Sequence, residues 1–188
     1  MIKNLIITAH PDDEILFCSR FLLNNASETR VITVTTPNKN RRIEFEDVME
    51  YIGVRDYEMW RFEDDGEIQI RGGYELNHLD KDIKLKDKLK EIKEDRYKKI
   101  ITHNENGDYS HIHHKYIHDV VTTELNEDKI YTFSKDKEPL SDGYLKVKQY
   151  IFNNFYKSQS GAILLNPDFD RYVNKEGLDK YIKTGKER

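Results

Sequence analysis

Histidine and acidic side chains form two groups that are far apart along the chain. Five of the seven histidines lie within 16 residues of one another: His103, His111, His113, His114 and His118. A sixth, His10, is followed by the acidic run Asp12-Asp13-Glu14. Imidazole nitrogens and carboxylate oxygens are preferred zinc ligands in hydrolytic sites. The two groups predict a metal centre if the fold brings them together, and within it we expect His103 and His118 to be structural.

The spacing of these residues indicates how they can share one ion. His10 and Asp13 are separated by two residues after an apolar run, so a strand-to-helix turn can direct both at one metal. His111 and His114, three residues apart, lie on one face of a predicted helix and can supply further ligands. A metal lowers the pKa of its water towards about 7, but a base must still take the proton. Asp12 is well placed to be that base.

The elements that carry these residues predict an α/β fold. Apolar or β-branched runs at 2–8, 31–35, 57–62, 99–102 and 130–133 are typical of strands. Helices are predicted after Pro11, from 41 to Gly53, and over 77–96, 110–125 and 143–157. Strands that alternate with helices form a mostly parallel sheet, and ligands bind beyond the carboxyl ends of its strands. Both histidine groups fall at such ends.

Length, charge and cysteine content narrow the class of protein. The 188 residues suit one globular domain, and no repeat or linker divides them. The 31 basic and 35 acidic residues argue against a nucleic-acid footprint over the whole chain. The single cysteine, Cys18, excludes an intrachain disulfide framework. Because no signal-peptide core or 18-residue apolar stretch is present, we expect a cytoplasmic protein without a membrane span.

Two motifs resemble those of a known family. The segment Ala9-His10-Pro11-Asp12-Asp13-Glu14 is similar, at six consecutive positions, to the signature of the PIG-L/LmbE-like family of zinc-dependent N-deacetylases. Residues 107–114 resemble the family's second motif, Gly-x-Tyr-Gly-His-x-x-His. Weaker similarity is found at 41–44, at Asp65-Gly66 and at 156–159. The resemblance covers about 1–125 and implies that 1–188 is a single LmbE-like deacetylase domain, a Rossmann-like three-layer sandwich.

The resemblance also implies roles for individual residues. It assigns the zinc to three side chains: His10, Asp13 and His114. Asp12 is implied as the general base that activates water. His111 is implied to stabilise the oxyanion and to help protonate the departing amine, and Tyr109 to polarise the carbonyl. The same donors also accept Fe²⁺, Co²⁺ or Ni²⁺, so the native metal stays open.

Substrate contacts and one departure from the family pattern complete the expected site. Arg41 and Asp65 are implied to hold sugar hydroxyls; a solvated helix residue and a plain turn residue are the alternatives. Many family members carry Asp where this chain has His113, which can also compete as a ligand, although the i,i+3 spacing favours the pair His111 and His114. Asp108 or Asp119 can supply the missing carboxylate, which in the family pattern supports His111.

These observations predict a zinc-dependent hydrolase that removes the N-acetyl group from an N-acetylglucosamine-type conjugate, by attack of a metal-bound water on the amide. Two alternatives stay open. One is a metal-dependent amidase for another N-acyl glycoside, and the other is a catalytically silent sugar- or nucleotide-binding module of the same fold. No Gly-x-Gly-x-x-Gly follows the first predicted strand, which argues against dinucleotide binding. The acceptor that carries the sugar and the oligomeric state are not indicated by any motif.

Overall fold

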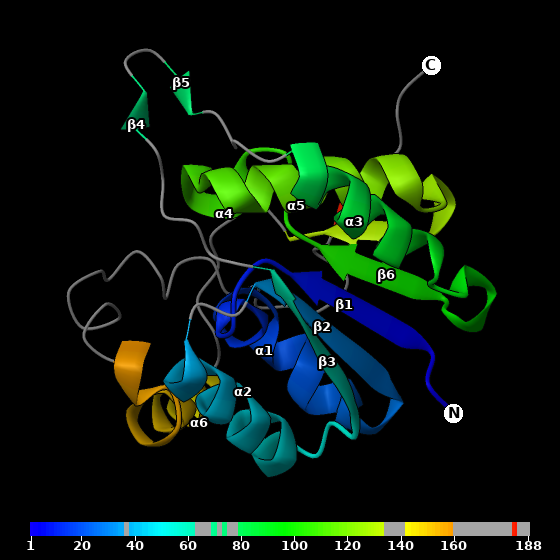
Figure 1. Cartoon of the computed structure of the whole chain (residues 1–188). Coiled ribbons are helices and arrows are strands. Elements are labelled where there is room, and N and C mark those ends of the chain that lie inside the picture. The colour runs from blue at the N-terminus through cyan, green and yellow to red at the C-terminus, as the bar shows by residue number, and fades with distance from the viewer. Residues whose placement is uncertain are drawn as a thin grey trace.

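A mostly parallel sheet forms the centre of the protein (Figure 1). The computed structural model describes residues 1–35, 38–62, 69–70, 73–74, 79–133, 142–159 and 182–183. Within these residues the sheet has the order β3-β2-β1-β6-β7-β8. Its strands are β1 (Asn4–Thr8), β2 (Thr29–Thr35), β3 (Asp56–Phe62), β6 (Lys99–Thr102), β7 (Ile130–Thr132) and β8 (Ile182–Lys183). The first five run parallel and β8 is antiparallel to β7, which confirms the predicted fold class.

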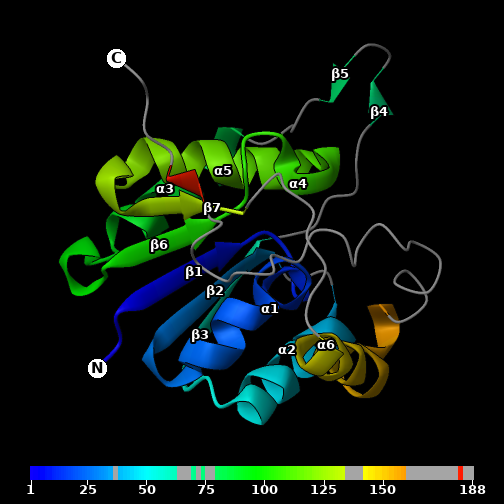
Figure 2. The same cartoon turned by 180° about the vertical axis from the view of Figure 1, so that it is seen from behind.

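Helices cover both faces of the sheet (Figures 1 and 2). One layer holds α1 (Asp13–Asn25), α2 (Lys39–Ile52) and α6 (Asp142–Asn154). The other holds α3 (Leu79–Lys90), α5 (Ile112–Glu124) and the short α4 (Gly107–Ser110). Short 3₁₀ turns lie at Ala26–Glu28, Glu94–Arg96, Glu127–Lys129 and Lys157–Gln159.

The alternation of side chains along β1 explains why the strands are apolar throughout. Ile6 belongs to the core cluster with α1, α2 and α6, whereas Leu5 and Ile7 belong to the cluster with α3 and α5. A parallel strand covered on both faces has no side that can carry polar residues without burying them. Burial of a leucine or isoleucine side chain contributes about 2 kcal/mol, so both layers are held by the hydrophobic effect.

The helix ends follow local chemistry, and the differences from the sequence predictions are local too. Asn38 accepts a hydrogen bond from the Arg41 N–H at 3.0 Å and begins α2. Gly53 ends α2 with φ of 82°, as predicted. The helix predicted over 77–96 is shorter, because α3 ends at Lys90. The hairpin β4 (Gln69–Ile70) and β5 (Gly73–Tyr74) was not predicted, since two residues carry no periodicity.

The order of the strands places the two histidine groups side by side. The chain builds β1, β2 and β3 outward in one direction and then returns to pair β6 on the other side of β1. The carboxyl ends of β1 and β6 therefore meet at the switch point, where ligands of open α/β sheets bind. His10 follows β1 and His103 follows β6 directly.

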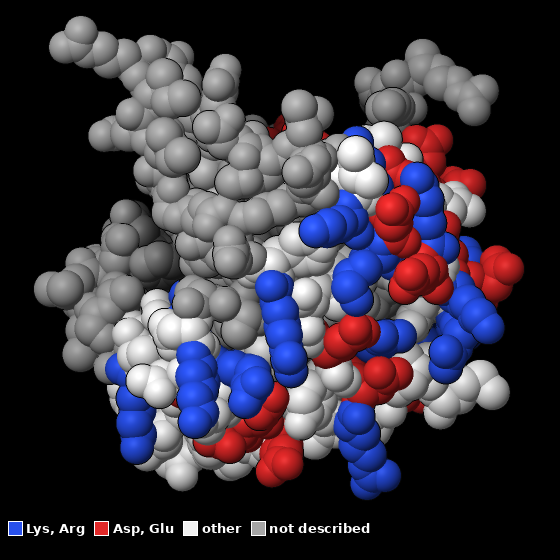
Figure 3. Space-filling view, viewed as in Figure 1, with Lys and Arg blue, Asp and Glu red and all other residues white. Residues whose placement is uncertain are grey.

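Charged side chains of both signs are intermixed on the surface seen in Figure 3. Glu58 on β3, for example, contacts Arg30 at 2.6 Å and Lys88 at 3.6 Å. Such a mixture of signs is typical of a solvated surface. Among the residues described above, no helix has the length and apolar character that crossing a membrane requires.

Candidate metal centre

Three buried ligand atoms converge where β1 and β6 end. Nδ1 of His10 lies 3.2 Å from Nε2 of His114, and Oδ2 of Asp13 lies 3.4 Å from each of these nitrogens. Tetrahedral zinc with bonds near 2.05 Å has ligand atoms about 3.3 Å apart. The three atoms therefore have the spacing of one face of a zinc tetrahedron. The residues predicted to share an ion do lie together.

The turn after β1 aims two of these side chains. The His10 N–H donates to Oδ2 of Asp13 at 2.7 Å, which fixes the carboxylate against the end of the strand. Asp12, the N-cap of α1, has φ of 107° and ψ of −29°, a left-handed conformation that residues other than glycine rarely adopt. Such strain costs about 1–3 kcal/mol and persists only where the surroundings hold it.

Asp108 supports His114 from the side away from Asp13. Its Oδ2 accepts hydrogen bonds from Nδ1 of His114 at 2.9 Å and from Nδ1 of His103 at 2.5 Å. Burial alone would raise the pKa of Asp108, but the two histidines outweigh it and lower that pKa below its usual value. Asp108 is thus the carboxylate that the sequence left open between Asp108 and Asp119. It contacts His114 rather than His111, and Asp119 is exposed.

His103 has both ring nitrogens occupied. The Ala9 N–H donates to Nε2 at 2.8 Å, and Nδ1 donates to Asp108. Nε2 therefore offers no lone pair to a metal, although it lies 3.5 Å from Asp13. His118 donates from Nδ1 to the His103 carbonyl at 2.9 Å. Both histidines make the structural contacts expected of them.

His113 contacts the side of the His10 ring that is opposite the three candidate ligand atoms. Its Nδ1 is 3.0 Å from Nε2 of His10, the ring nitrogen that faces away from Asp13 and His114. This contact leaves Nδ1 of His10 directed at the other two candidate ligands. The side chain that replaces the family's usual Asp therefore orients His10, and it does not compete as a ligand in this arrangement.

His111 does not lie on the helix as predicted. The helix predicted from 110 to 125 breaks at His111, which is the N-cap of α5, with φ of −69° and ψ of 130°. Its Nδ1 accepts the His113 N–H at 3.3 Å, so the neutral ring carries its proton on Nε2. Burial, followed by the positive charges of His114 and His10, lowers the pKa of His111 to about 3. At neutral pH the half-buried ring is an uncharged N–H donor beside the cluster.

Asp12 and Arg41 form a mostly buried ion pair beside the cluster. Nη2 of Arg41 lies 3.1 Å from Oδ2 of Asp12 and donates to the Pro11 carbonyl at 2.5 Å. Burial raises the pKa of Asp12 to about 7, although Arg41 opposes the shift. A carboxylate with that pKa can take up a proton near neutral pH. The alternative of a solvated Arg41 disagrees with its 13% side-chain exposure.

Tyr109 lies at the rim of the cluster. Its ring stacks on Phe17 with 6.0 Å between centroids and meets the His114 ring edge-on at 5.1 Å. Asp108 and Ser110 on either side have φ of 62° and 75°, so the segment turns sharply around the tyrosine. Burial raises the pKa of Tyr109, and the hydroxyl therefore stays neutral. Asp65, the other predicted sugar contact, lies outside the described residues.

Two further buried side chains adjoin the cluster and were given no role from the sequence. The Tyr156 hydroxyl donates to Oε1 of Glu14, and Oε2 of Glu14 accepts the Asp12 N–H at 3.1 Å. Burial raises the pKa of Glu14 to about 8. Glu14 was visible in the sequence as part of the first motif, but nothing in the sequence indicated its contact with Tyr156.

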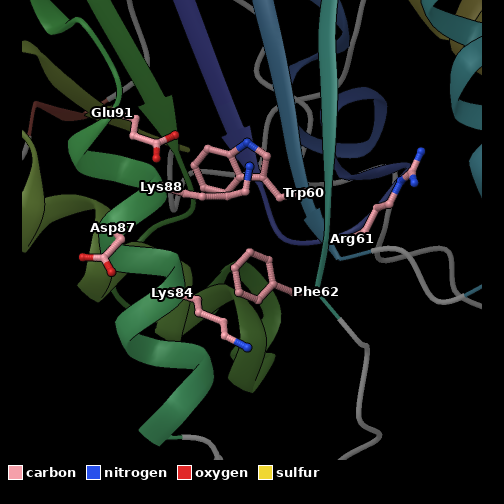
Figure 4. A pocket seen from close by; sticks show the side chains of 7 residues that line it. All are labelled: Trp60, Arg61, Phe62, Lys84, Asp87, Lys88 and Glu91. Atoms are coloured by element: carbon pink, nitrogen blue, oxygen red, sulfur yellow. The ribbon is translucent and has the colours of Figure 1, made fainter.

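A separate pocket of about 610 Å³ lies between β3 and α3 (Figure 4). Trp60 and Phe62 point from β3 toward α3, whereas Arg61 between them points away. Arg61 has φ of 59°, and two residues of β3 oppose one of β2 here, which is the pattern of a β-bulge. None of the residues that line the pocket belongs to the metal cluster.

Comparison with known proteins adds three findings. The model of the PIG-L family, described as GlcNAc-PI de-N-acetylase, matches residues 5–125. An uncharacterized protein of Acanthamoeba polyphaga mimivirus is 29% identical over 189 aligned positions, which span 91% of this chain and 78% of that protein. A similar solved structure is GalB, the 4-carboxy-2-hydroxymuconate hydratase of Pseudomonas putida. It has a TM-score of 0.52 and 11% identity over 89% of each chain, so the likeness is one of fold.

Proposed function

We propose that this chain, which belongs to the PIG-L family of GlcNAc-PI de-N-acetylases, is a zinc-dependent hydrolase that removes the N-acetyl group from an N-acetylglucosamine-type conjugate. One observation carries the proposal. The triangle of His10, Asp13 and His114 has the spacing of zinc ligands and adjoins a carboxylate whose pKa is near neutrality. Amide hydrolysis requires both features in one site.

The donor set fits a zinc ion. Two imidazoles and one carboxylate are a common protein ligand set for catalytic zinc. Asp108 accepts from the ring nitrogen of His114 that is not offered to the ion, which fixes the tautomer of His114, and His113 contacts the corresponding nitrogen of His10. Zinc held there would supply a Lewis acid for the amide carbonyl and a water of lowered pKa. Fe²⁺ or another divalent metal is the alternative cofactor.

The residues around the cluster can carry out the proton transfers. Asp12 would take a proton from the attacking water as the new C–O bond forms. Nε2–H of His111 would donate to the oxygen that becomes negative, and Tyr109 at the rim would polarise the same carbonyl. When the C–N bond breaks, the amine needs a proton. Asp12 then holds one and would transfer it to the amine, while the uncharged His111 would assist by its hydrogen bond and keep its own proton.

Arg41 is proposed to contact the sugar as well as Asp12. Its Nη2 is engaged by Asp12 and Pro11, whereas its buried Nε has no hydrogen-bond partner among the described residues. Buried donors are nearly always paired, so a donor without a partner beside a cluster of this kind suits a substrate oxygen. Asp65 stays a proposed sugar contact.

The proposal is tested by metal content and acetate release. The purified chain should hold about one zinc, and His114→Ala should hold much less. Zinc-loaded protein should release acetate from N-acetylglucosamine conjugates, and Asp12→Asn should lower this rate by about 10²–10⁴-fold while it keeps its zinc. Asp119→Asn is the matched control, because Asp119 is exposed on α5.

Each alternative gives a different result in the same experiment. Faster release of longer acyl groups than of acetate would favour the amidase for another N-acyl glycoside. Zinc binding without release of any acyl group would favour the silent binding module. Equal zinc in the parent and in His114→Ala would contradict the ligand set itself.

A further inference from the structure

We propose that the segment Tyr156–Ser158, which lies outside the family-matched residues 5–125, positions Asp12 by holding the N-terminal turns of α1 and α2. The proposal rests on the proposed function, because it explains how the base of that reaction is held. Tyr156 and Glu14 are positioning residues in this scheme. It gives the part of the chain after α5 a role in the site.

The first connection runs through three buried residues. Tyr156 is fully buried directly after α6, and its hydroxyl donates to Oε1 of the fully buried Glu14, 142 residues earlier in the chain. The other carboxylate oxygen of Glu14 accepts the Asp12 N–H at 3.1 Å. With one oxygen bound to each partner, the carboxyl group of Glu14 is held in one orientation. The position of the Tyr156 hydroxyl is therefore transmitted to the backbone of Asp12.

The backbone of Asp12 needs such support. Its φ of 107° is left-handed, and an aspartate does not hold this conformation without help. Glu14 alone would be a local cap for the first turn of α1 and could rotate away. Contact with Tyr156 makes the cap part of the tertiary structure. The same turn carries His10 and Asp13, so its shape also sets the metal ligands.

The second connection reaches Asp12 from α2. The Ser158 N–H and hydroxyl donate to the two oxygens of Glu44, at 2.9 and 2.6 Å. Glu44 lies one helical turn after Arg41, which contacts Oδ2 of Asp12. Ser158 is exposed, so we expect this connection to be weaker than the buried one.

Contacts of α6 keep the segment in place. The buried Lys148 donates from Nζ to the Leu16 carbonyl at 2.9 Å, which ties α6 to α1. The Tyr156 ring packs on Phe152 with 5.5 Å between centroids. Removal of the whole tyrosine side chain would disrupt this packing. The test therefore removes the hydroxyl alone.

The experiment compares Tyr156→Phe with Tyr150→Phe, a control on α6 whose side chain is 48% exposed. Amide hydrogen exchange is measured by NMR on zinc-loaded protein at Asp12, with the buried Ile6 of β1 as the reference. Tyr156→Phe should speed exchange at Asp12 by about tenfold and leave Ile6 unchanged. It should also lower kcat for acetate release by about tenfold with little change in KM. Tyr150→Phe should change none of these values.

A double variant tests whether Tyr156 acts through Glu14. If it does, Glu14→Leu, which removes both contacts, and the double variant Glu14→Leu/Tyr156→Phe should show the same exchange at Asp12. Additive effects would overturn the connection. Equal acceleration at Asp12 and Ile6 in Tyr156→Phe would show a role in global stability only, and parental exchange at Asp12 would also refute the proposal. Failure of the parent to release acetate would refute the proposed function, while the exchange measurement would still decide this one.

Discussion

Replacement of Asp108 by asparagine should weaken zinc binding by a predictable amount. Both Nδ1 donors, from His103 and His114, meet the same oxygen, Oδ2. An asparagine whose carbonyl oxygen occupies that position keeps both hydrogen bonds but loses the negative charge. Asparagine also tolerates the φ of 62° at this position, so the backbone should not change. The amide nitrogen would then replace Oδ1, which accepts the Asn104 N–H at 3.4 Å, so the substitution removes the charge together with this one long hydrogen bond.

The expected loss of zinc affinity depends on how many histidine hydrogen bonds to Asp108 lose a charged acceptor. A hydrogen bond to a charged group is worth about 1 kcal/mol more than a neutral one. Loss of this assistance in the His114 bond alone would weaken zinc binding about fivefold. If the His103 bond also contributes, the loss is about 2 kcal/mol, or roughly thirtyfold. We expect the zinc Kd of Asp108→Asn to rise by a factor between these values.

The assay is competition for zinc with a chelating dye, at a temperature well below the unfolding transition. Asp119→Asn, which changes an exposed aspartate on the same side of the sheet, is the control and should bind zinc like the parent. An unchanged Kd for Asp108→Asn would refute the argument that Asp108 prepares His114 for the metal. A loss far above a hundredfold would indicate that Asp108 binds the ion directly.

Four further predictions follow from the same structure. Removal of zinc with a chelator should lower Tm in differential scanning, because zinc binds the folded state; an unchanged Tm would contradict the site. Arg41→Met should raise KM, because it removes a proposed sugar contact, and lower kcat, because it removes the partner of Asp12. Arg42→Met, at the next position of α2, should change neither value in a steady-state acetate assay. Phe45→Ala should cost about 3–5 kcal/mol in urea denaturation, because Phe45 is fully buried; a cost below about 1 kcal/mol would contradict its place in the core. Gly53→Ala should cost about 1 kcal/mol through its φ of 82° alone, since nothing lies within 4 Å of the added Cβ.

The sheet and the ends of its strands could be predicted because the relevant signals are local. The apolar runs around Ile6 and Ile101 and the Gly53 cap depend on neighbouring residues only. The meeting of His10 with His114 followed from the rule that parallel strands present their carboxyl ends at one edge. The family motifs added the roles of these residues, which spacing alone left open between His111 and His114.

The parts that could not be predicted depend on long-range contacts or on single dihedral angles. The helix break at His111 arises because the sharp turn around Tyr109 delays the start of α5, and no propensity indicates it. The sequence did not indicate which carboxylate supports the histidines. In the structure, Asp108 accepts hydrogen bonds from both His103 and His114. The contact between Glu14 and Tyr156 joins residues 142 positions apart, and a single sequence carries no signal for such pairs.

The separation of the proposed ligands along the chain has a consequence for how the protein is made. His10 and His114 are 104 positions apart, so an ion that joins them closes a long loop, much as a distant cross-link does. During synthesis the first motif, which carries His10 and Asp13, is made early. The third proposed ligand, His114, is made only with α5, after β6. A chain that stops before His114 would display the first motif in full and still lack the site. Retained zinc would thus report that β6 has paired with β1. A zinc-sensitive dye could therefore measure the rate of that step during refolding.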